Sequence, residues 1–260
     1  MKGHECMVNI KTKEEIDILR EAGKVHAFIL QTLQEAVQPG VSAMELDTLA
    51  RAMLEEYGMR PAFYNYTPEG VSYPYPAALC VSVNDEVVHG IPLEDIILEE
   101  GDIVSLDLGV EHKNLITDSA ITVPVGFVSE KVEALLKATK KALEKGIEAA
   151  QPGNTVGDIG HAIESFVKPH GYGIVKILAG HGVGYSVHED PYIPNYGKPG
   201  TGEKLVPGMV IAIEPMLTLG GDEVAVTEDE YTYVTYDGSL SAHFEHTVAI
   251  TEQGPVILTK

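Results

Sequence analysis

The stretch Gly101-Asp102-Ile103-Val104-Ser105-Leu106-Asp107-Leu108-Gly109-Val110 places an acidic residue inside an apolar run with the character of a β-strand. A second stretch, Gly208-Met209-Val210-Ile211-Ala212-Ile213-Glu214-Pro215-Met216-Leu217, repeats this pattern, and in both the acid comes six residues after the glycine. Burying an unpaired carboxylate costs so much free energy that the group normally neutralises or is excluded from the core. Two such acids in matched frames therefore predict a duplicated architecture that gathers carboxylates around metal ions.

The repeat extends to the segments around these stretches. Gln38-Pro39-Gly40 and Gln151-Pro152-Gly153 each end a long helical pattern and precede a second helix. We predict an α+β protein with pseudo-twofold symmetry, in which two helix pairs cover one face of an antiparallel sheet. No linker separates the halves, about 10–125 and 126–253, so residues 1–260 are expected to form one domain. The expected helices are 13–37, 42–57, 129–150 and 155–169, and the expected strands are 78–83, 103–110, 119–123, 174–178, 209–217, 231–235 and 247–250.

The composition restricts the class of protein. The chain has 260 residues, 44% of them apolar, with a net charge of −21. Such acidity argues against a nucleic acid as the main partner, because phosphate binding needs a basic surface. No apolar run is long enough for a transmembrane helix, and the N-terminus lacks the pattern of a secretory signal. Two cysteines, Cys6 and Cys80, give no disulfide framework, so an intracellular compartment is expected.

Five residues form a candidate metal set. Asp107 and Asp118 flank a predicted hairpin turn over 111–114, and His181 lies among glycines. Taken singly, such an aspartate is more often a cap or an ion-pair partner, and such a histidine is more often structural. Together, four carboxylates and a neutral imidazole carry four negative charges, which two divalent cations balance. Oxygen-rich ligation suits Mn, Fe or Co, and Zn is also compatible. The proposed ligands are Asp107, Asp118, His181, Glu214 and Glu245.

With these residues and their flanking motifs, the chain resembles the type I methionine aminopeptidases, which have the pita-bread fold. The resemblance covers nearly the whole chain. The motifs that carry it are Asn84-Asp85-Glu86-Val87-Val88-His89-Gly90-Ile91-Pro92, the Asp107 and Asp118 pair, Gly180-His181-Gly182-Val183-Gly184, His188-Glu189-Asp190-Pro191, Ile213-Glu214-Pro215-Met216 and Phe244-Glu245-His246-Thr247.

The resemblance implies a role for each ligand. Asp118, His181, Glu214 and Glu245 would hold a first metal ion. Asp107 would hold a second, with Asp118 and Glu245 shared between the two. The metals would activate water and polarise the scissile carbonyl, and Glu214 would also shuttle a proton.

The resemblance further assigns residues that touch the substrate. His89 would stabilise the transition state near the scissile amide, and His188 would contact a substrate carbonyl, although each could be an ordinary hydrogen-bonded loop residue. The initiator methionine needs an apolar pocket, in which Cys80 would be a packing residue and not a nucleophile. Ordinary core packing is the alternative for every wall residue. By resemblance, the wall comprises Phe63, Tyr66, Tyr75, Cys80, Val187 and Tyr231.

Three features depart from the family pattern. Between Tyr66 and Tyr75 lie eight residues, 67–74, where the family usually has about two. Val187 replaces the usual aromatic residue, and His243 replaces the usual glutamine. The first two departures put the shape of the methionine pocket in question.

The implied function is removal of the N-terminal methionine from nascent proteins with a small second residue, in the cytoplasm. The expected form is a monomer with no membrane partner and no specific nucleic acid, and transient contact with the ribosome is compatible with it. Two alternatives stay open. One is a proline-selective aminopeptidase of the same fold, and the other is a non-catalytic pita-bread protein that binds partners.

Overall fold

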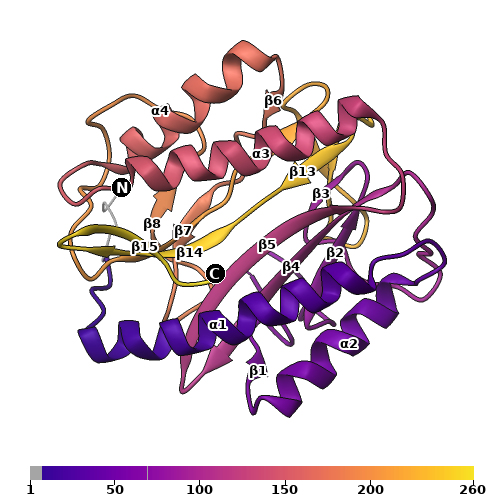
Figure 1. Cartoon of the computed structure of the whole chain (residues 1–260), viewed down its shortest axis with the longest axis horizontal. Coiled ribbons are helices and arrows are strands. Elements are labelled where there is room, and N and C mark those ends of the chain that lie inside the picture. The colour runs from indigo at the N-terminus through magenta and orange to yellow at the C-terminus, as the bar shows by residue number, and fades with distance from the viewer. Residues whose placement is uncertain (1–7, 69) are drawn as a thin grey trace.

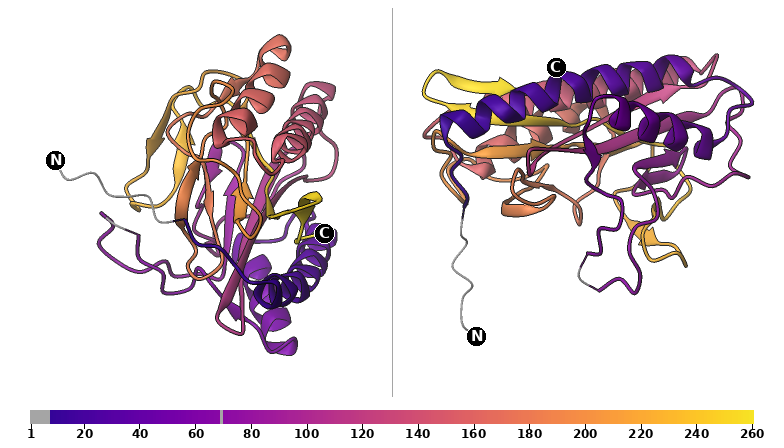
Figure 2. Two further views of the ribbon diagram at one scale, coloured as in Figure 1. Left: turned by 90° about the vertical axis from the view of Figure 1, so that its left-hand side faces the viewer. Right: turned by 90° about the horizontal axis from the view of Figure 1, so that it is seen from below.

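The computed structural model describes residues 8–68 and 70–260, so Cys6 and Glu69 lie outside the described residues. The long helices gather on one face of a set of antiparallel sheets, as Figures 1 and 2 show. The predicted α+β class and its repeated helix pairs are therefore confirmed. None of the helices in the described ranges has an apolar stretch long enough to cross a membrane.

The four α-helices begin at capping residues that the sequence supplies. Thr12 and Ser42 each accept a hydrogen bond from the backbone N–H of a glutamate three residues on, and that glutamate bonds back to the cap. These reciprocal bonds satisfy donors that the first helical turn leaves free. The predicted helix bounds are confirmed to within about two residues. The helices are α1 (Lys13–Ala36), α2 (Ala43–Glu56), α3 (Glu130–Ala149) and α4 (Val156–Val167), and the 3₁₀ turn η1 (Lys168–His170) follows α4.

Within residues 8–68 and 70–260, the strands pair in four antiparallel sheets. Their orders are β1-β4-β2 with β5 on the other side of β4, β13-β10-β6, β11-β12-β3, and β15-β14-β9-β7-β8. The strands are β1 (Arg60–Pro61), β2 (Leu79–Val83), β3 (Glu86–Val88), β4 (Ile103–His112), β5 (Leu115–Pro124), β6 (Gly173–Ile174), β7 (Gly180–Gly182), β8 (Glu189–Ile193), β9 (Val210–Ile213), β10 (Met216–Thr218), β11 (Val224–Val226), β12 (Tyr233–Thr235), β13 (Ser241–His243), β14 (His246–Thr251) and β15 (Gly254–Ile257).

The predicted strand over 209–217 is wrong as a single element. It breaks at Glu214-Pro215, where the chain leaves β9 in one sheet and enters β10 in another. Proline cannot donate to a strand ladder, so the break falls where pairing is already lost. The strand predicted over 174–178 is also too long, because only Gly173–Ile174 is paired.

The hairpin that joins β4 to β5 is confirmed, but its turn is shorter than predicted. His112 pairs with Leu115, so only Lys113 and Asn114 form the turn. Their φ angles are 51° and 63°. A two-residue turn with both φ angles positive matches the twist of the flanking strands, so the ladder continues to the turn.

A hydrogen-bonded seam joins the two repeats, formed by Asp118–Thr122 of β5 and His243–Thr247 around β13 and β14. The Thr247 hydroxyl accepts from the Asp118 N–H at 2.8 Å and donates to the Asp118 carbonyl at 2.7 Å. The Thr122 hydroxyl does the same for His243, at 2.8 and 2.7 Å. Side-chain hydroxyls thus take the place of ladder bonds, and they satisfy backbone groups that burial would otherwise penalise.

Each repeat has its own hydrophobic core beneath its helices. One core lies under α1 and α2 and includes Leu33, Leu46 and Leu106. The other lies under α3 and α4 and includes Leu135 and Ile159. The seam lies between these two cores.

The buried residue His26 of α1 should make the free energy of unfolding depend on pH in the acid range. Burial lowers the pKa of this histidine to about 3, from 6.5, and its Nδ1 lies 3.0 Å from the Thr117 hydroxyl. Below pH 6.5 the unfolded chain binds a proton at this residue that the folded chain does not. The difference in the free energy of unfolding between wild type and His26→Gln should therefore shrink as pH falls from 6.5 to 5, by about 1.4 kcal/mol per pH unit.

Urea unfolding at several pH values measures this difference. The matched control is His161→Gln, at an exposed helical histidine, which should follow wild type throughout. Equal pH slopes for wild type and His26→Gln would contradict the assignment.

Candidate metal centre

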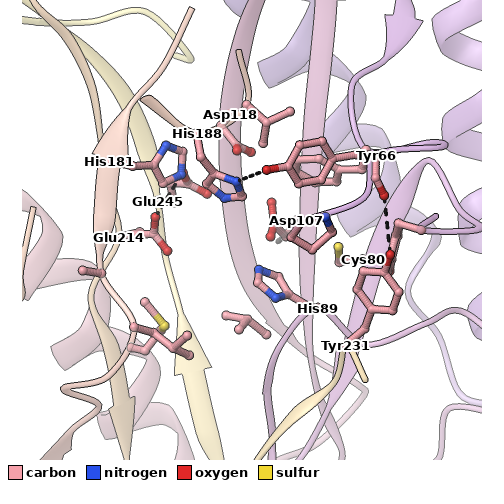
Figure 3. A pocket seen from close by; sticks show the side chains of 18 residues that line it. Tyr66, Cys80, His89, Asp107, Asp118, His181, His188, Glu214, Tyr231 and Glu245 are labelled. Carbon is pink, nitrogen blue, oxygen red and sulfur yellow. Dashed lines mark hydrogen bonds and ion pairs between the residues drawn. The ribbon is translucent and has the colours of Figure 1, made fainter. Parts of the chain in front are cut away.

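A cavity of about 160 Å³ is lined by residues of both repeats. Every candidate site residue from the sequence lines it. Figure 3 shows the acidic and histidine side chains converging on one part of the cavity, with Tyr66 and Tyr231 across from His181 and Glu214. The predicted residues that line it are Phe63, Tyr66, Tyr75, Cys80, His89, Asp107, Asp118, His181, Val187, His188, Glu214, Tyr231 and Glu245.

Strand register places the first two acids on one face. Asp107 of β4 pairs with Ala120, and Asp118 of β5 pairs with Gly109. The aspartates therefore lie diagonally across the hairpin, where side chains two positions apart along a strand share a face. Both side chains are buried.

The other two acids, Glu214 and Glu245, lie at breaks in two neighbouring strand segments: Glu214 between β9 and β10, and Glu245 between β13 and β14. Glu214 follows β9 and Glu245 precedes β14, and the flanking pairs are Ile213 with His246 and Met216 with His243. The Glu245 N–H donates to the Ala120 carbonyl of β5 at 2.9 Å. This bond in the seam brings Glu245 beside Asp118.

The four carboxylates are electrostatically unfavourable without a cation. Burial raises the pKa of Asp107 to about 7 and that of Glu214 to about 8. Burial and the neighbouring acids raise the pKa values of Asp118 and Glu245 well above the ordinary range. Among the described residues, no group hydrogen-bonds the buried Asp107 Oδ1, Asp118 Oδ1 or Glu245 Oε1. Oxygen atoms arranged in this way suit hard divalent cations.

His181 presents one nitrogen to this cluster. Its Nδ1 lies 2.9 Å from the Gly182 carbonyl, which fixes the proton on Nδ1 and leaves the lone pair on Nε2. Burial lowers the pKa of His181 to about 3, so the ring is neutral at pH 7. Donor atoms of Asp118, His181 and Glu245 all lie within 4.8 Å of one another, close enough to share one ion.

His243 adjoins the site, although the sequence marked it only as a departure. Its ring is buried, and its Nε2 lies 3.5 Å from Glu214 Oε2, while His181 Nε2 lies 3.4 Å from Glu214 Oε1. The Glu214 carboxylate therefore sits between two imidazoles. Sequence reasoning missed this because His243 faces Glu214 only through the β10–β13 pairing.

His89 and His188 reach the cavity from opposite sides. His89 follows β3 with a φ of 61°, a left-handed conformation that is costly for a histidine and typical of functional sites. Burial lowers the pKa of His89 to about 3. His188 Nδ1 lies 2.8 Å from the Tyr66 hydroxyl, so this bond spans the cavity.

The apolar wall of the cavity is closely packed. A Cβ on Gly109 would lie 2.6 Å from the Phe63 ring, so glycine at this position lets Phe63 pack over β4. Burial and the Asp107 charge raise the pKa of the Cys80 thiol well above its usual range, which agrees with a packing role and not with a nucleophile.

Five further residues line the cavity that the sequence analysis did not single out, although Val88 adjoins His89 and Met216 lies two residues after Glu214. These are Pro68, Val88, Leu178, Ala179 and Met216.

Known proteins match this chain over almost its full length. Residues 17–252 match metallopeptidase family M24. The methionine aminopeptidases of Clostridium acetobutylicum and Aquifex aeolicus are 45% and 47% identical, each over 97% of this chain and 99% of the relative. The structure of the Thermotoga maritima methionine aminopeptidase superposes with a TM-score of 0.94 at 45% identity, covering 98% of this chain and all of that one. The Pyrococcus furiosus prolidase gives 0.77 at 27% identity, covering 96% of this chain and 65% of that one.

Repulsion among the four acids should make Asp118→Asn more stable than wild type without metal, but less strongly stabilised than wild type by added metal. In metal-free protein at pH 8, Asp118→Asn should raise the free energy of unfolding by about 2 kcal/mol, because it removes a buried acid that burial and the neighbouring acids destabilise in its charged form. With saturating Mn²⁺ or Co²⁺, wild type should gain stability and the variant should gain much less. Thermal unfolding with and without chelator measures both effects.

The control is Glu252→Gln, at an exposed acid in the turn between β14 and β15. It should leave both states unchanged. A metal-free Asp118→Asn protein that is less stable than wild type would argue against repulsion in the cluster.

Proposed function

The chain belongs to the type I methionine aminopeptidases of metallopeptidase family M24, and from that membership we propose that it removes the N-terminal methionine from proteins and peptides. The observation that carries the proposal is the buried carboxylate cluster at one end of a cavity whose other walls are apolar. A methionine side chain needs such an apolar wall, and hydrolysis of its peptide bond needs the polar end.

We assign two divalent ions to the polar end. Bound there, such ions would polarise a scissile carbonyl and lower the pKa of water. Asp118 and Glu245 would serve both ions and Asp107 would serve one, so that the four acids would balance the charge of the two ions. The ions are Mn, Fe, Co or Zn, since oxygen-rich ligation with one imidazole suits these metals. The assigned ligands are Asp107, Asp118, His181, Glu214 and Glu245.

Glu214 is the residue we assign to proton transfer. Its carboxyl group is buried at the polar end of the cavity, and a general acid–base group must lie within hydrogen-bond reach of the proton that it moves. Its carboxylate takes the proton of the attacking water and passes it to the leaving amine. His181 Nε2 and His243 Nε2 lie 3.4 and 3.5 Å from its two oxygens.

His89 and His188 bind the substrate backbone in this proposal. Both are neutral at pH 7 and can donate an N–H to an oxygen that gains negative charge. His89 acts at the scissile amide, and its left-handed backbone conformation directs the ring into the cavity. His188 contacts a substrate carbonyl, with its Nδ1 held by Tyr66.

The apolar wall binds the methionine side chain. Tyr75 and Tyr231 pack edge to face at 5.1 Å, and such aromatic pairs make a firm surface. Cys80 and Val187 are buried beside them. The wall residues in this proposal are Phe63, Tyr66, Tyr75, Cys80, Val187 and Tyr231.

The remaining assignments follow from family membership. We propose that the substrates are nascent proteins with a small second residue, met in the cytoplasm with at most transient ribosome contact. We further propose that the chain acts as a monomer, with residues 1–260 as a single catalytic domain. The proline-selective alternative is weaker, because the prolidase is 27% identical with a TM-score of 0.77, against 45% and 0.94 for the methionine aminopeptidase. A non-catalytic role is also disfavoured, since all five ligand candidates are present at the cavity.

Hydrolysis of two peptides tests the activity. Metal-stripped protein should release methionine from Met-Ala-Ser once Mn²⁺, Co²⁺, Fe²⁺ or Zn²⁺ is added back, and it should not cleave Ala-Pro-Ser. Free amino acid, measured by chromatography, is the readout. Cleavage of Ala-Pro-Ser alone would move the chain to the proline-selective branch, and no cleavage with any metal would favour the partner-binding role.

Two variants separate metal ligands from substrate-binding residues in the same assay. Glu245→Ala should lose both turnover and bound metal. His89→Ala should keep its metal content but lose about 100-fold in rate, because it removes only a hydrogen-bond donor. Full turnover by Glu245→Ala, or metal loss in His89→Ala, would refute the assignment concerned.

A further inference from the structure

The segment 67–74, which the sequence marked as longer than usual, is tied to the body of the protein at its neck. The Asn65 N–H donates to the Tyr75 carbonyl at 2.9 Å, and the Tyr75 N–H donates to the Tyr66 carbonyl at 2.8 Å. These bonds close the segment as a compact loop between two residues of the cavity wall. Pro68, within the loop, lines the cavity itself.

The far side of the loop is fastened to a second turn, residues 229–231. The Ser72 N–H donates to Glu230 Oε2 at 2.7 Å, and the Tyr73 hydroxyl donates to the Asp229 carbonyl at 2.6 Å. Asp229 Oδ1 accepts from the Tyr231 N–H at 2.8 Å, so the turn is ordered from within as well. The loop and this turn, more than 150 residues apart in sequence, therefore form one unit at the mouth of the cavity.

Tyr231 is held between two tyrosines in this unit. Its ring meets Tyr75 on the cavity side at 5.1 Å and 71°, and Tyr73 of the loop at 5.2 Å and 76°. The Tyr231 hydroxyl donates to the Tyr73 carbonyl, and Figure 3 shows it directed at the Tyr66 carbonyl as well. Edge-to-face pairs on two sides and a bonded hydroxyl leave the ring only 4% exposed and little room to turn.

We propose that Tyr73 is a specificity-determining residue that acts through Tyr231, and that it limits how bulky an N-terminal side chain the cavity accepts. The proposal rests on the function proposed above. Tyr73 lies outside the cavity lining, so it does not touch the substrate. Its ring packs against Tyr231. Removing the Tyr73 ring frees that side of Tyr231, so the Tyr231 ring can tilt about its bonded hydroxyl, which enlarges the pocket.

The effect should appear as a change in selectivity. The ratio of kcat/KM for Met-Ala-Ser to that for Phe-Ala-Ser should fall by about tenfold or more in Tyr73→Ala, within the range that apolar pockets achieve. Tyr73→Phe should restore the wild-type ratio, because it keeps the ring edge against Tyr231 and loses only the bond to Asp229. A purely structural defect would lower both rates together and leave the ratio unchanged.

The matched control is Tyr64→Ala, at a tyrosine just before the loop neck whose ring stacks on Arg51, away from the cavity. It should keep the wild-type ratio. If Tyr73→Ala does not fold, as judged by circular dichroism, Tyr73→Leu replaces it and should show the same loss.

Two outcomes overturn the proposal. One is an unchanged ratio in a folded Tyr73→Ala or Tyr73→Leu protein, and the other is an equal loss in Tyr73→Phe. Failure of wild type to release methionine from Met-Ala-Ser would instead refute the proposed function, so the two claims fail separately.

Discussion

Mutual repulsion among four buried carboxylates is the constraint on which this structure depends. Asp107, Asp118, Glu214 and Glu245 are buried together, and burial is the largest cause of the raised pKa of each. A fold can hold them together only if stable elements fix their positions and bound cations or protons offset their charge. The two cores and the seam provide the first condition, and the proposed metal ions provide the second.

The hydrogen bonds of the seam hold the acids of the two repeats together in a single site. Each repeat alone contributes two acids, and neither pair resembles a complete binding site. Thr122, Ser119 and Thr247 join β5 to the region around Glu245 by short hydroxyl bonds to the backbone. Because these bonds fall beside the strand breaks, they fix the chain where regular ladder pairing is interrupted. The acids of the second repeat are thereby as firmly placed as those of the first.

Much of this arrangement could be predicted, and the failures have physical causes. Asp107 and Asp118 were predicted to be neighbours because a hairpin is local, and the register confirms it. The break at Glu214-Pro215 was missed, because an apolar run looks the same whether it stays in one sheet or crosses between two. His243 beside Glu214 and Tyr73 against Tyr231 depend on pairings between distant segments. A single sequence carries little information about such contacts, and the fold pattern itself was predicted from the repeat.

The central claim is that the two repeats bring five side chains together around metal. Anomalous diffraction from crystals of the protein loaded with Mn²⁺ or Co²⁺ tests it most directly. We expect anomalous peaks within bonding distance of Asp107, Asp118, His181, Glu214 and Glu245, with Asp118 and Glu245 between two ions. Peaks only at other positions, with these five side chains bound to no ion at saturating metal, would contradict it.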